Sequence, residues 1–419
     1  MEFQDRIRFT VKLAWRNVFR NRRRTFLTGL IIGIGLAAMM FTDAWITGMK
    51  DNMIESATSS FLGDAQIHRE GFQESYDNEL TVAADERIVS RLERDENVRS
   101  YTRRVISYGT ISSPADIGSI LIYGIEPASE PALSEIDESL VEGAYLADTA
   151  GGGYGGKGVL VGAELAEELE VEVGDRVVLT TSKAETGELA QDLFRVRGIY
   201  RMHMDELDSR VALISLHQAQ ELVGVVGSVH EIALRFQDTR YARTSAAAFS
   251  GDYSLEGNLA QTWPELVPQI KYVLDMTDVS IGVTVVIVFA VIIFGIINTL
   301  FMSLYERMFE FGVLRAVGTR SGRLIGLIVV EAAVLALYSS LLGMGLGAAV
   351  IGLGSVYGMD LTGVEFAGTT FTGRIYTVFH LRQFLLHPAL VFAFTVLVSV
   401  YPARYAGRMS VTRALQRTL

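Results

Sequence analysis

The chain has 419 residues, a mean hydropathy of +0.29 and 49% hydrophobic side chains, which is typical of an integral membrane protein. The formal net charge of −11 is unevenly distributed: residues 48–278 hold 40 acidic and 19 basic side chains, and the remainder is net basic. An acidic region of this kind repels phosphates, which argues against nucleic acid as a partner. The absence of cysteine excludes disulfides, thiolate metal sites and thiol nucleophiles.

The first 24 residues combine eight basic side chains with apolar ones between them. This pattern predicts a cytoplasmic amphipathic helix over 1–24 that lies on a membrane surface. A nucleic-acid-binding arm is the less favoured alternative, because an apolar segment follows at once. That segment, residues 25–47, is long enough to cross a bilayer and lacks a convincing signal cleavage site, so we predict a first transmembrane helix there.

Three further apolar segments predict transmembrane helices over 279–304, 324–354 and 384–405. His387 and Pro388 interrupt the last of these, and Pro402 is expected to kink it. Basic residues gather at the start of the chain, in 305–323 and in the tail 406–419, so the positive-inside rule places all three in the cytoplasm. The predicted fold is therefore an α-helical membrane protein with four transmembrane helices, both termini cytoplasmic, and an outer loop over 355–383.

Residues 48–278 lie between the first two spans and are predicted to form a large extracytoplasmic domain of mixed α/β structure. Alternating hydrophobicity predicts strands at 177–181 and 194–199, and helices are expected at 163–169 and 217–223. The sequence GGGYGGKG, residues 151–158, nearly matches a phosphate-binding loop, but Gly158 stands where the magnesium-binding hydroxyl is required. A flexible loop is the better interpretation.

We find no constellation of residues in this domain that predicts catalysis. The histidines of this domain are scattered along the sequence: His68, His203, His217 and His230. We interpret them as surface residues or as core residues with hydrogen-bond partners. The acidic segment 202–210 is interpreted as a solvated loop. The chain is therefore expected not to be an enzyme, to hold no metal and to bind no cofactor directly.

Two ionisable residues fall within the predicted spans, where a charge is costly. Asp43 is interpreted as an anchor that reaches the lipid headgroups, and Glu331 as a structural ion pair with Arg307 or Arg315. Gly343 and Gly347 form a G-x-x-x-G helix-packing face. We expect either plain bundle packing there or, together with the second span, an interface to another subunit.

Residues 305–323 join the second and third spans through a short charged segment. Apolar residues recur at helical spacing while Phe311 and Leu314 fall off that stripe, so a helix here offers apolar surface in two directions. On this pattern alone, an ordinary interfacial helix and a protein-docking helix are equally compatible.

The segment ERMFEFGVLRAVG, residues 306–318, resembles the signature of a family of ABC transporter permeases. That family includes the lipoprotein-releasing transporters, the MacB-type macrolide exporters and the FtsX-like cell-division proteins. LAWRNVFRNRRRTFLTGLIIGIG (13–35), GDAQIHREGF (63–72) and PARYAGRMSVTRAL (402–415) extend the resemblance over nearly the whole chain. The external segments look most like the lipoprotein-releasing (LolC/LolE-like) branch.

The resemblance implies a permease of the bacterial inner membrane that dimerises with itself or a relative. It also implies docking of separate ATPase subunits, which bind ATP and magnesium, and transmission of their motion to the external domain. The implied substrate is a lipoprotein or another amphipathic molecule; the alternative is a signalling protein that regulates an envelope hydrolase or senses an external ligand. The residues that match the ATPase-docking (coupling) helix are Glu306, Arg307, Phe309, Glu310, Phe311, Gly312, Leu314, Arg315 and Gly318.

Overall fold

The computed structural model describes residues 2–146, 157–202, 204–361, 365–366, 369–370 and 374–408. The chain divides into two compact units. The helical unit comprises residues 1–51, 274–361 and 373–419, and the α/β unit comprises residues 52–273 and 362–372.

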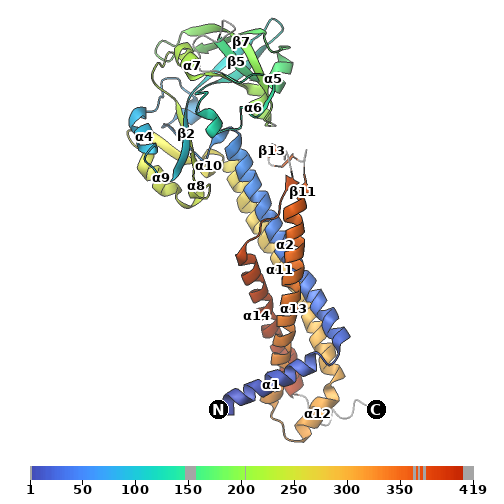
Figure 1. The fold of residues 1–419 in the computed structure, drawn as a ribbon. Coiled ribbons are helices and arrows are strands. Elements are labelled where there is room, and N and C mark those ends of the chain that lie inside the picture. The colour runs from blue at the N-terminus through green and yellow to red at the C-terminus, as the bar shows by residue number, and fades with distance from the viewer. Residues whose placement is uncertain are drawn as a thin grey trace. The chain divides into compact units, whose positions relative to one another are not determined.

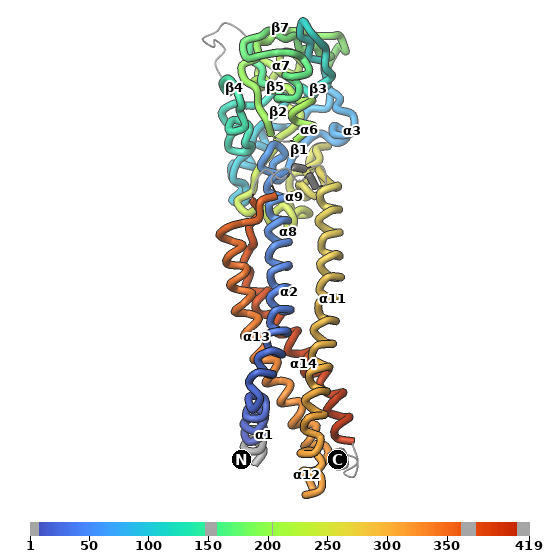
Figure 2. Tube along the Cα trace, turned by 90° about the vertical axis from the view of Figure 1, so that its right-hand side faces the viewer, coloured from blue at the N-terminus to red at the C-terminus, as the bar shows by residue number. Residues whose placement is uncertain are grey.

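The helical unit is built on four helices that are long and apolar enough to cross a membrane (Figure 1). They are α2 (Arg22–Ala57), α11 (Pro268–Glu306), α13 (Ser321–Tyr357) and α14 (Leu381–Arg408). Each predicted span coincides with one of them. Two shorter helices, α1 (Glu2–Val18) and α12 (Met308–Ala316), lie at the same end of the unit (Figures 1 and 2).

The long helices extend beyond the predicted membrane limits. Helix α2 continues past residue 47 and passes into a π-helical turn, η1 (Thr58–Leu62), and α11 begins before residue 279. Polar residues such as Asp51 and Glu55 are compatible with a helix outside the bilayer, so hydropathy locates the span but not the helix end. Helix α14 is continuous although it contains Pro388 and Pro402. Much of the predicted tail 406–419 lies outside the described residues.

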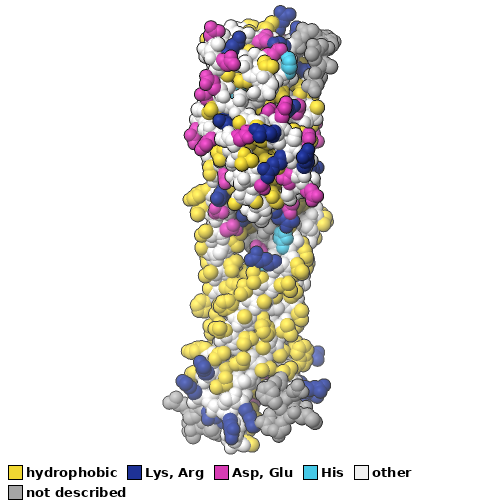
Figure 3. Space-filling view, turned by 90° about the vertical axis from the view of Figure 1, so that its left-hand side faces the viewer, with side chains coloured by type: hydrophobic (Ala, Val, Ile, Leu, Met, Phe, Trp, Pro, Cys, Tyr) yellow, Lys and Arg dark blue, Asp and Glu magenta, His cyan; other side chains and the backbone are white. Residues whose placement is uncertain are grey.

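The core of the helical unit is an apolar cluster contributed by all four long helices. Ile32, Leu36 and Met40 of α2 are fully buried in it, and they pack with Ile296 of α11 and Val391 of α14. Outward-facing residues of the same helices are also apolar, and Figure 3 shows hydrophobic side chains over this surface, with Lys and Arg gathered at the end where α12 lies. Helices that are apolar inside and outside are suited to a lipid environment.

The α/β unit contains a sheet of ten described strands, and this confirms the predicted mixed α/β fold. In sheet order the strands are β10 (Asn258–Thr262), β1 (Ala65–Arg69), β9 (Glu231–Phe236), β2 (Val98–Ser112), β3 (Ile117–Ile125), β8 (Val211–Ser215), β5 (Lys157–Gly162), β7 (Leu189–Tyr200) and β4 (Leu140–Gly143), with β6 (Arg176–Ser182) paired to β2 and β7. Strands β3 and β8 pair in parallel, as do β5 and β7, and the other pairs of this sheet are antiparallel.

Short helices complete this unit. Those expected at 163–169 and 217–223 are confirmed as α5 (Ala163–Glu168) and α7 (Leu216–Val223). Helix α7 packs closely on β3, because a Cβ atom on Gly124 would lie 2.1 Å from the Cβ atom of Ala219. The remaining helices are α3 (Phe72–Ser75), α4 (Asp85–Leu92), η2 (Glu130–Ala132), α6 (Asp205–Arg210), α8 (Tyr241–Thr244), α9 (Ala246–Tyr253) and α10 (Trp263–Leu266).

In the predicted outer loop, β11 (Met359–Asp360) pairs with β14 (Arg374–Ile375), and β12 (Glu365–Phe366) with β13 (Thr369–Thr370).

One sequence interpretation in this unit is wrong. The segment 202–210 is not a solvated loop but contains α6, and the Asp208 side chain is buried and accepts a hydrogen bond from the Met202 N–H at 2.8 Å. Charge density alone suggested solvation, yet an aspartate that bonds to backbone N–H groups can be buried. Most of the glycine-rich stretch 151–158 lies outside the described residues, whereas Lys157 and Gly158 begin β5.

The histidines of this unit behave as expected where they are described. His230 is fully buried: its Nδ1 accepts the Ile106 N–H at 3.0 Å, and its Nε2 therefore donates to the Asn78 carbonyl at 3.0 Å. His68 is buried against Gln66 and Glu231, while His217 is exposed. His203 lies outside the described residues.

Candidate functional site

Helix α12 is delimited by two backbone features of its own sequence. Arg307 leaves helical geometry (φ −105°, ψ 12°), which separates α12 from α11. At the other end, Gly318 adopts φ +99° and donates its N–H to the Arg315 carbonyl, while the Thr319 N–H bonds to the Leu314 carbonyl. This is a Schellman motif, in which the left-handed residue is usually glycine because a Cβ atom is disfavoured there. Gly318 therefore ends α12.

One face of α12 is built into the helical unit. Met308 and Phe311 are 5% and 3% exposed, and they pack with Leu304, Leu324, Ile328, Ala403 and Ala406. Gly312 is buried as well. Phe311 and Gly312 were predicted to dock an ATPase, but this burial leaves them no surface for a partner, so that prediction is wrong for these two residues. Hydrophobic periodicity could not distinguish which of the two apolar faces turns inward.

The opposite face of α12 is apolar and exposed. We call it the α12 patch. Its four members are Phe309, Val313, Leu314 and Val317, whose exposed fractions are 48%, 41%, 41% and 83%. Phe309, Val313 and Val317 are spaced four residues apart and therefore share one side of the helix. Of the predicted docking residues, Phe309 and Leu314 belong to this patch, and Val313 and Val317 were not among the docking residues inferred from the resemblance.

The charged residues of the segment form an arginine–glutamate network with α1, α2 and α13. Arg307 donates to Glu331 at 2.8 Å and to Glu310 at 3.1 Å, and its guanidinium lies over the Phe311 ring. The predicted partnership of Glu331 with Arg307 is confirmed. Arg315 instead donates to the Gly407 carbonyl at 3.0 Å. The network consists of Asn17, Arg20, Arg24, Glu306, Arg307, Glu310 and Glu331.

Residues near the amino terminus complete this network. The Asn17 side-chain amide donates to Glu331 at 2.6 Å, Arg20 donates to Glu310 at 2.8 Å, and Arg24 pairs with Glu306. Glu306 and Glu310 thereby hold the start of α12 against the turn between α1 and α2. Burial tends to raise the pKa of Glu310, but hydrogen bonds from Arg20 and Arg307 outweigh it and keep that pKa below its usual value. The carboxylate is therefore charged at neutral pH.

The other residues singled out in the spans have partners within the same helical unit. Asp43 accepts a hydrogen bond from His387 Nε2 of α14 at 3.0 Å, and its contact with the headgroups stays a prediction. In the sequence, His387 was visible only as an interruption of an apolar segment, and nothing linked it to Asp43. Gly343 lies against Gly33 and Leu36 of α2, and Gly347 against Met40. Their face packs within the chain, which is the bundle-packing alternative.

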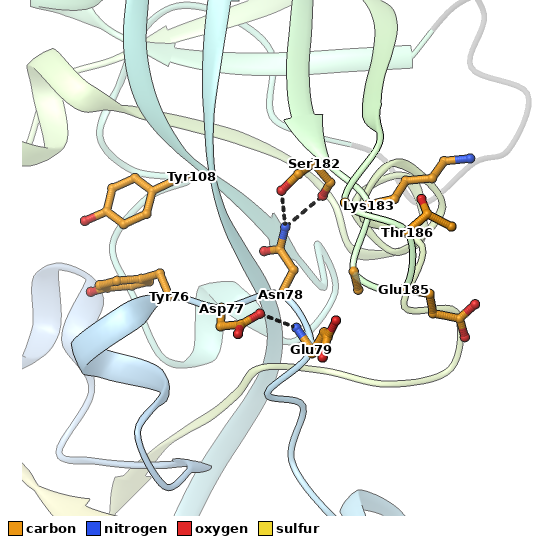
Figure 4. Close-up of a pocket in the computed structure, with 11 residues that line it drawn as sticks. Tyr76, Asp77, Asn78, Glu79, Tyr108, Ser182, Lys183, Glu185 and Thr186 are labelled. Carbon is orange, nitrogen blue, oxygen red and sulfur yellow. Dashed lines mark hydrogen bonds between the residues drawn. The ribbon is translucent and has the colours of Figure 1, made fainter.

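The α/β unit has an open cavity of about 420 Å³. Figure 4 shows Asn78 between the two sides of this cavity, and its amide donates to the Ser182 carbonyl at 2.8 Å. The rings of Tyr76 and Tyr108 lie 5.0 Å apart on one side, and Glu185 lies on the other. Among the described residues no group of three His, Asp or Glu side chains could hold a metal ion. The contacts seen here secure the hairpin between β6 and β7.

Two family models match the chain. The MacB-like periplasmic core domain matches residues 25–249, and the FtsX-like permease C-terminal domain matches residues 282–411. The first covers more than half of the chain, and the second contains α12 and the two spans that follow it.

Relatives with curated names agree with these matches. The chain is 21% identical over 426 residues to the lipoprotein-releasing system transmembrane protein LolE of Haemophilus influenzae, covering 96% of this chain and 98% of the relative. It is 23% identical to LolC of Xylella fastidiosa, covering 71% and 72%. A crystal structure of the periplasmic region of MacB from Actinobacillus actinomycetemcomitans aligns with 52% of this chain and 95% of its own, at 12% identity and a TM-score of 0.35.

Together, the match over both parts of the chain, the four apolar helices and the α/β unit between the first two of them define a membrane protein of the bacterial type. The chain belongs to the family of FtsX-like ABC transporter permeases with a MacB-like periplasmic core domain, and it resembles the LolC/LolE branch.

Proposed function

We propose that this permease couples ATP hydrolysis by separate ATPase subunits to motion of its extracytoplasmic domain, residues 48–278. The ATPase subunits bind the α12 patch from the cytoplasm. In this orientation both termini and α12 are cytoplasmic and the acidic domain lies outside, as the distribution of arginines predicts. A second permease protomer, either a copy of this chain or a related one, completes the transporter.

The α12 patch is the observation that carries the proposal. Three large apolar side chains of a nine-residue helix and that of Val317, which directly follows it, are exposed on one side, while the other side is packed into the helical unit. Exposed apolar residues beside a charged rim are typical of protein interfaces. Because Met308 and Phe311 fix α12 to α13 and α14, a force on the patch is transferred to those helices rather than absorbed by a loose loop.

The proposed substrate is a lipoprotein or another amphipathic molecule that is extracted from the outer surface of the inner membrane. Similarity to LolE along nearly the whole chain supports this choice. Depletion of the protein should then cause lipoproteins to accumulate in the inner membrane. If lipoproteins left that membrane normally and a cell-wall hydrolase copurified instead, the substrate assignment would be replaced by a signalling role.

The docking surface is tested by Phe309→Asp, which places a charge at the centre of the α12 patch. Copurification of the ATPase with the full-length permease should fall by about tenfold or more, because an apolar anchor of an interface contributes about 2 kcal/mol. Membrane insertion and thermal stability of the permease should be unchanged, because Phe309 is half exposed.

Phe311→Asp is the matched control. The same change only two residues away should lower the thermal stability of the permease itself, because Phe311 is buried. Undiminished copurification of the Phe309→Asp protein would overturn the docking assignment.

A further inference from the structure

An open cavity of about 560 Å³ lies where α1 turns into α2, beside the end of α11. Its lining is dominated by positive charge. Among the described residues that form it are four arginines, two asparagine amides and one carboxylate: Arg20, Arg22, Arg24, Arg307, Asn17, Asn21 and Glu306.

The carboxylates around the cavity are too few to neutralise all four arginines. Glu306 pairs with Arg24, Glu310 with Arg20 and Arg307, and Glu331 with Arg307. Three carboxylates thus face four guanidinium groups, and among the described residues no carboxylate pairs with Arg22. Arg20 remains 58% exposed although it is paired. The cavity therefore has donors available for an anion, and the planar arginine fork suits the oxygens of a phosphate.

The helix that leads into the cavity exposes large apolar side chains among basic ones. Phe9 and Trp15 of α1 are 69% and 54% exposed, and Val11 and Leu13 are exposed as well. A cluster of arginines beside an amphipathic helix at the end of a spanning bundle is the pattern that attracts anionic lipids. A molecule that satisfies both features has an anionic phosphate and hydrocarbon chains.

We propose that this cavity binds the phosphodiester headgroup of an anionic phospholipid, and that the headgroup competes with Glu306 and Glu310 for Arg24 and Arg20. When the headgroup is bound, α12 is released from the α1–α2 turn but keeps its packing through Met308 and Phe311. The charge of the membrane then sets how firmly α12 is held. The binding of lipid does not depend on the proposed function. Its effect on the coupling between ATPase and permease does rest on that function.

The binding is tested with the full-length chain in nanodiscs of phosphatidylcholine that contain a minority of phosphatidylglycerol. Native mass spectrometry then measures which lipid stays bound when the protein is released from the nanodisc. The lipid retained by the wild type should be enriched in phosphatidylglycerol. This enrichment should fall by about fivefold in Arg22→Ala, and by about fivefold again in the double variant that also carries Arg20→Ala. Arg404→Ala is the matched control, because it removes the same charge from an exposed position on α14 at the same end of the unit.

The competition is tested by a distance measurement. The chain has no cysteine, so spin labels can be placed at Lys12→Cys on α1 and Val317→Cys at the end of α12 without background. The distance between the labels should lengthen or broaden when phosphatidylglycerol replaces part of the phosphatidylcholine. Glu306→Gln with Glu310→Gln should give the same distribution in phosphatidylcholine alone.

Three results would overturn the proposal: no preference for phosphatidylglycerol, an equal loss of preference in Arg404→Ala, or a distance that is insensitive to lipid. Displacement of the lipid by inorganic phosphate would assign the cavity to a free anion instead. None of these measurements includes an ATPase. Failure of lipid binding and failure of the docking proposal are therefore separate outcomes.

Discussion

Glu331 is the residue at which three helices meet through a single carboxylate. It accepts hydrogen bonds from Asn17 of α1 and from Arg307 at the junction of α11 and α12, and it belongs to α13 itself. The side chains of Arg307 and Glu331 are only 11% and 12% exposed. Removing one partner of a charged pair with so little access to water is costly, because the remaining charge loses its buried partner. Without Glu331, the only carboxylate that Arg307 keeps in the described part of the chain is the more exposed Glu310.

Glu331→Ala should therefore lower the stability of the helical unit by about 2–3 kcal/mol. Thermal unfolding of the full-length protein in detergent measures this loss. The double variant with Arg307→Ala should be less destabilised than the sum of the two single variants, because neither charge of the pair then remains without the other. Strict additivity would show that the pair contributes nothing as a pair.

His230 couples the stability of the α/β unit to pH. Burial lowers its pKa below the ordinary value of 6.5, although two hydrogen bonds and nearby carboxylates oppose this effect. The unfolded chain consequently takes up a proton before the folded chain does. Stability from this residue is present above pH 6.5 and is lost as the pH falls through the folded-state pKa.

We therefore expect the α/β unit to lose stability below pH 6.5 with a slope that approaches about 1.4 kcal/mol per pH unit from this one group. Chemical denaturation of the full-length protein at a series of pH values measures the slope. In His230→Gln, the difference between neutral and acidic pH should shrink, because glutamine can still donate to the Asn78 carbonyl but does not titrate. An unchanged slope would assign the pH dependence to other residues.

At the scale of elements, α2 and α13 are held together by a contact that only glycine allows. A Cβ atom on Gly343 would lie 2.9 Å from the Gly33 carbonyl oxygen, so the two backbones would have to separate. By contrast, a Cβ atom on Gly345 meets nothing within 4 Å. Both glycines belong to α13 and differ in position by only two residues.

Gly343→Ala should destabilise the helical unit by about 1–3 kcal/mol, as expected for overpacking. Gly345→Ala, as the control, should be neutral or slightly stabilising, because alanine favours a helix by about 1 kcal/mol over glycine. Thermal unfolding of the two variants under identical conditions gives the comparison. Equal effects would mean that helix propensity, and not the α2–α13 contact, governs this position.

The elements themselves could largely be predicted from the sequence. Hydropathy located the four spans, and periodicity located α12, because both signals are local. What could not be predicted was which face of α12 turns inward and which residues neutralise its carboxylates. Arg20 and Glu310 are separated by 290 positions, and no local pattern links them. Arg20 and Arg24 were visible only as part of a basic segment, whereas their pairing depends on how α1 and α2 pack.

At the scale of the whole molecule, the asymmetry of charge predicts a topology that can be measured directly. Because the chain lacks cysteine, a single cysteine introduced at Val317 or at Val226, which are 83% and 75% exposed, reports its own location. In intact spheroplasts, a membrane-impermeant maleimide should label Val226→Cys. It should label Val317→Cys only after the membrane is opened. Labelling of both from outside would contradict the cytoplasmic position of α12.

The two prolines of α14 give the four long helices unequal stiffness. Each proline removes one backbone hydrogen bond and frees the carbonyl four residues earlier. Helices α2 and α13 contain no proline, and α11 has one only at its first position. Mechanical load on the bundle should therefore bend α14 near Pro388 and Pro402 while its neighbours stay straight. Helix α14 is then the most easily bent of the four long helices.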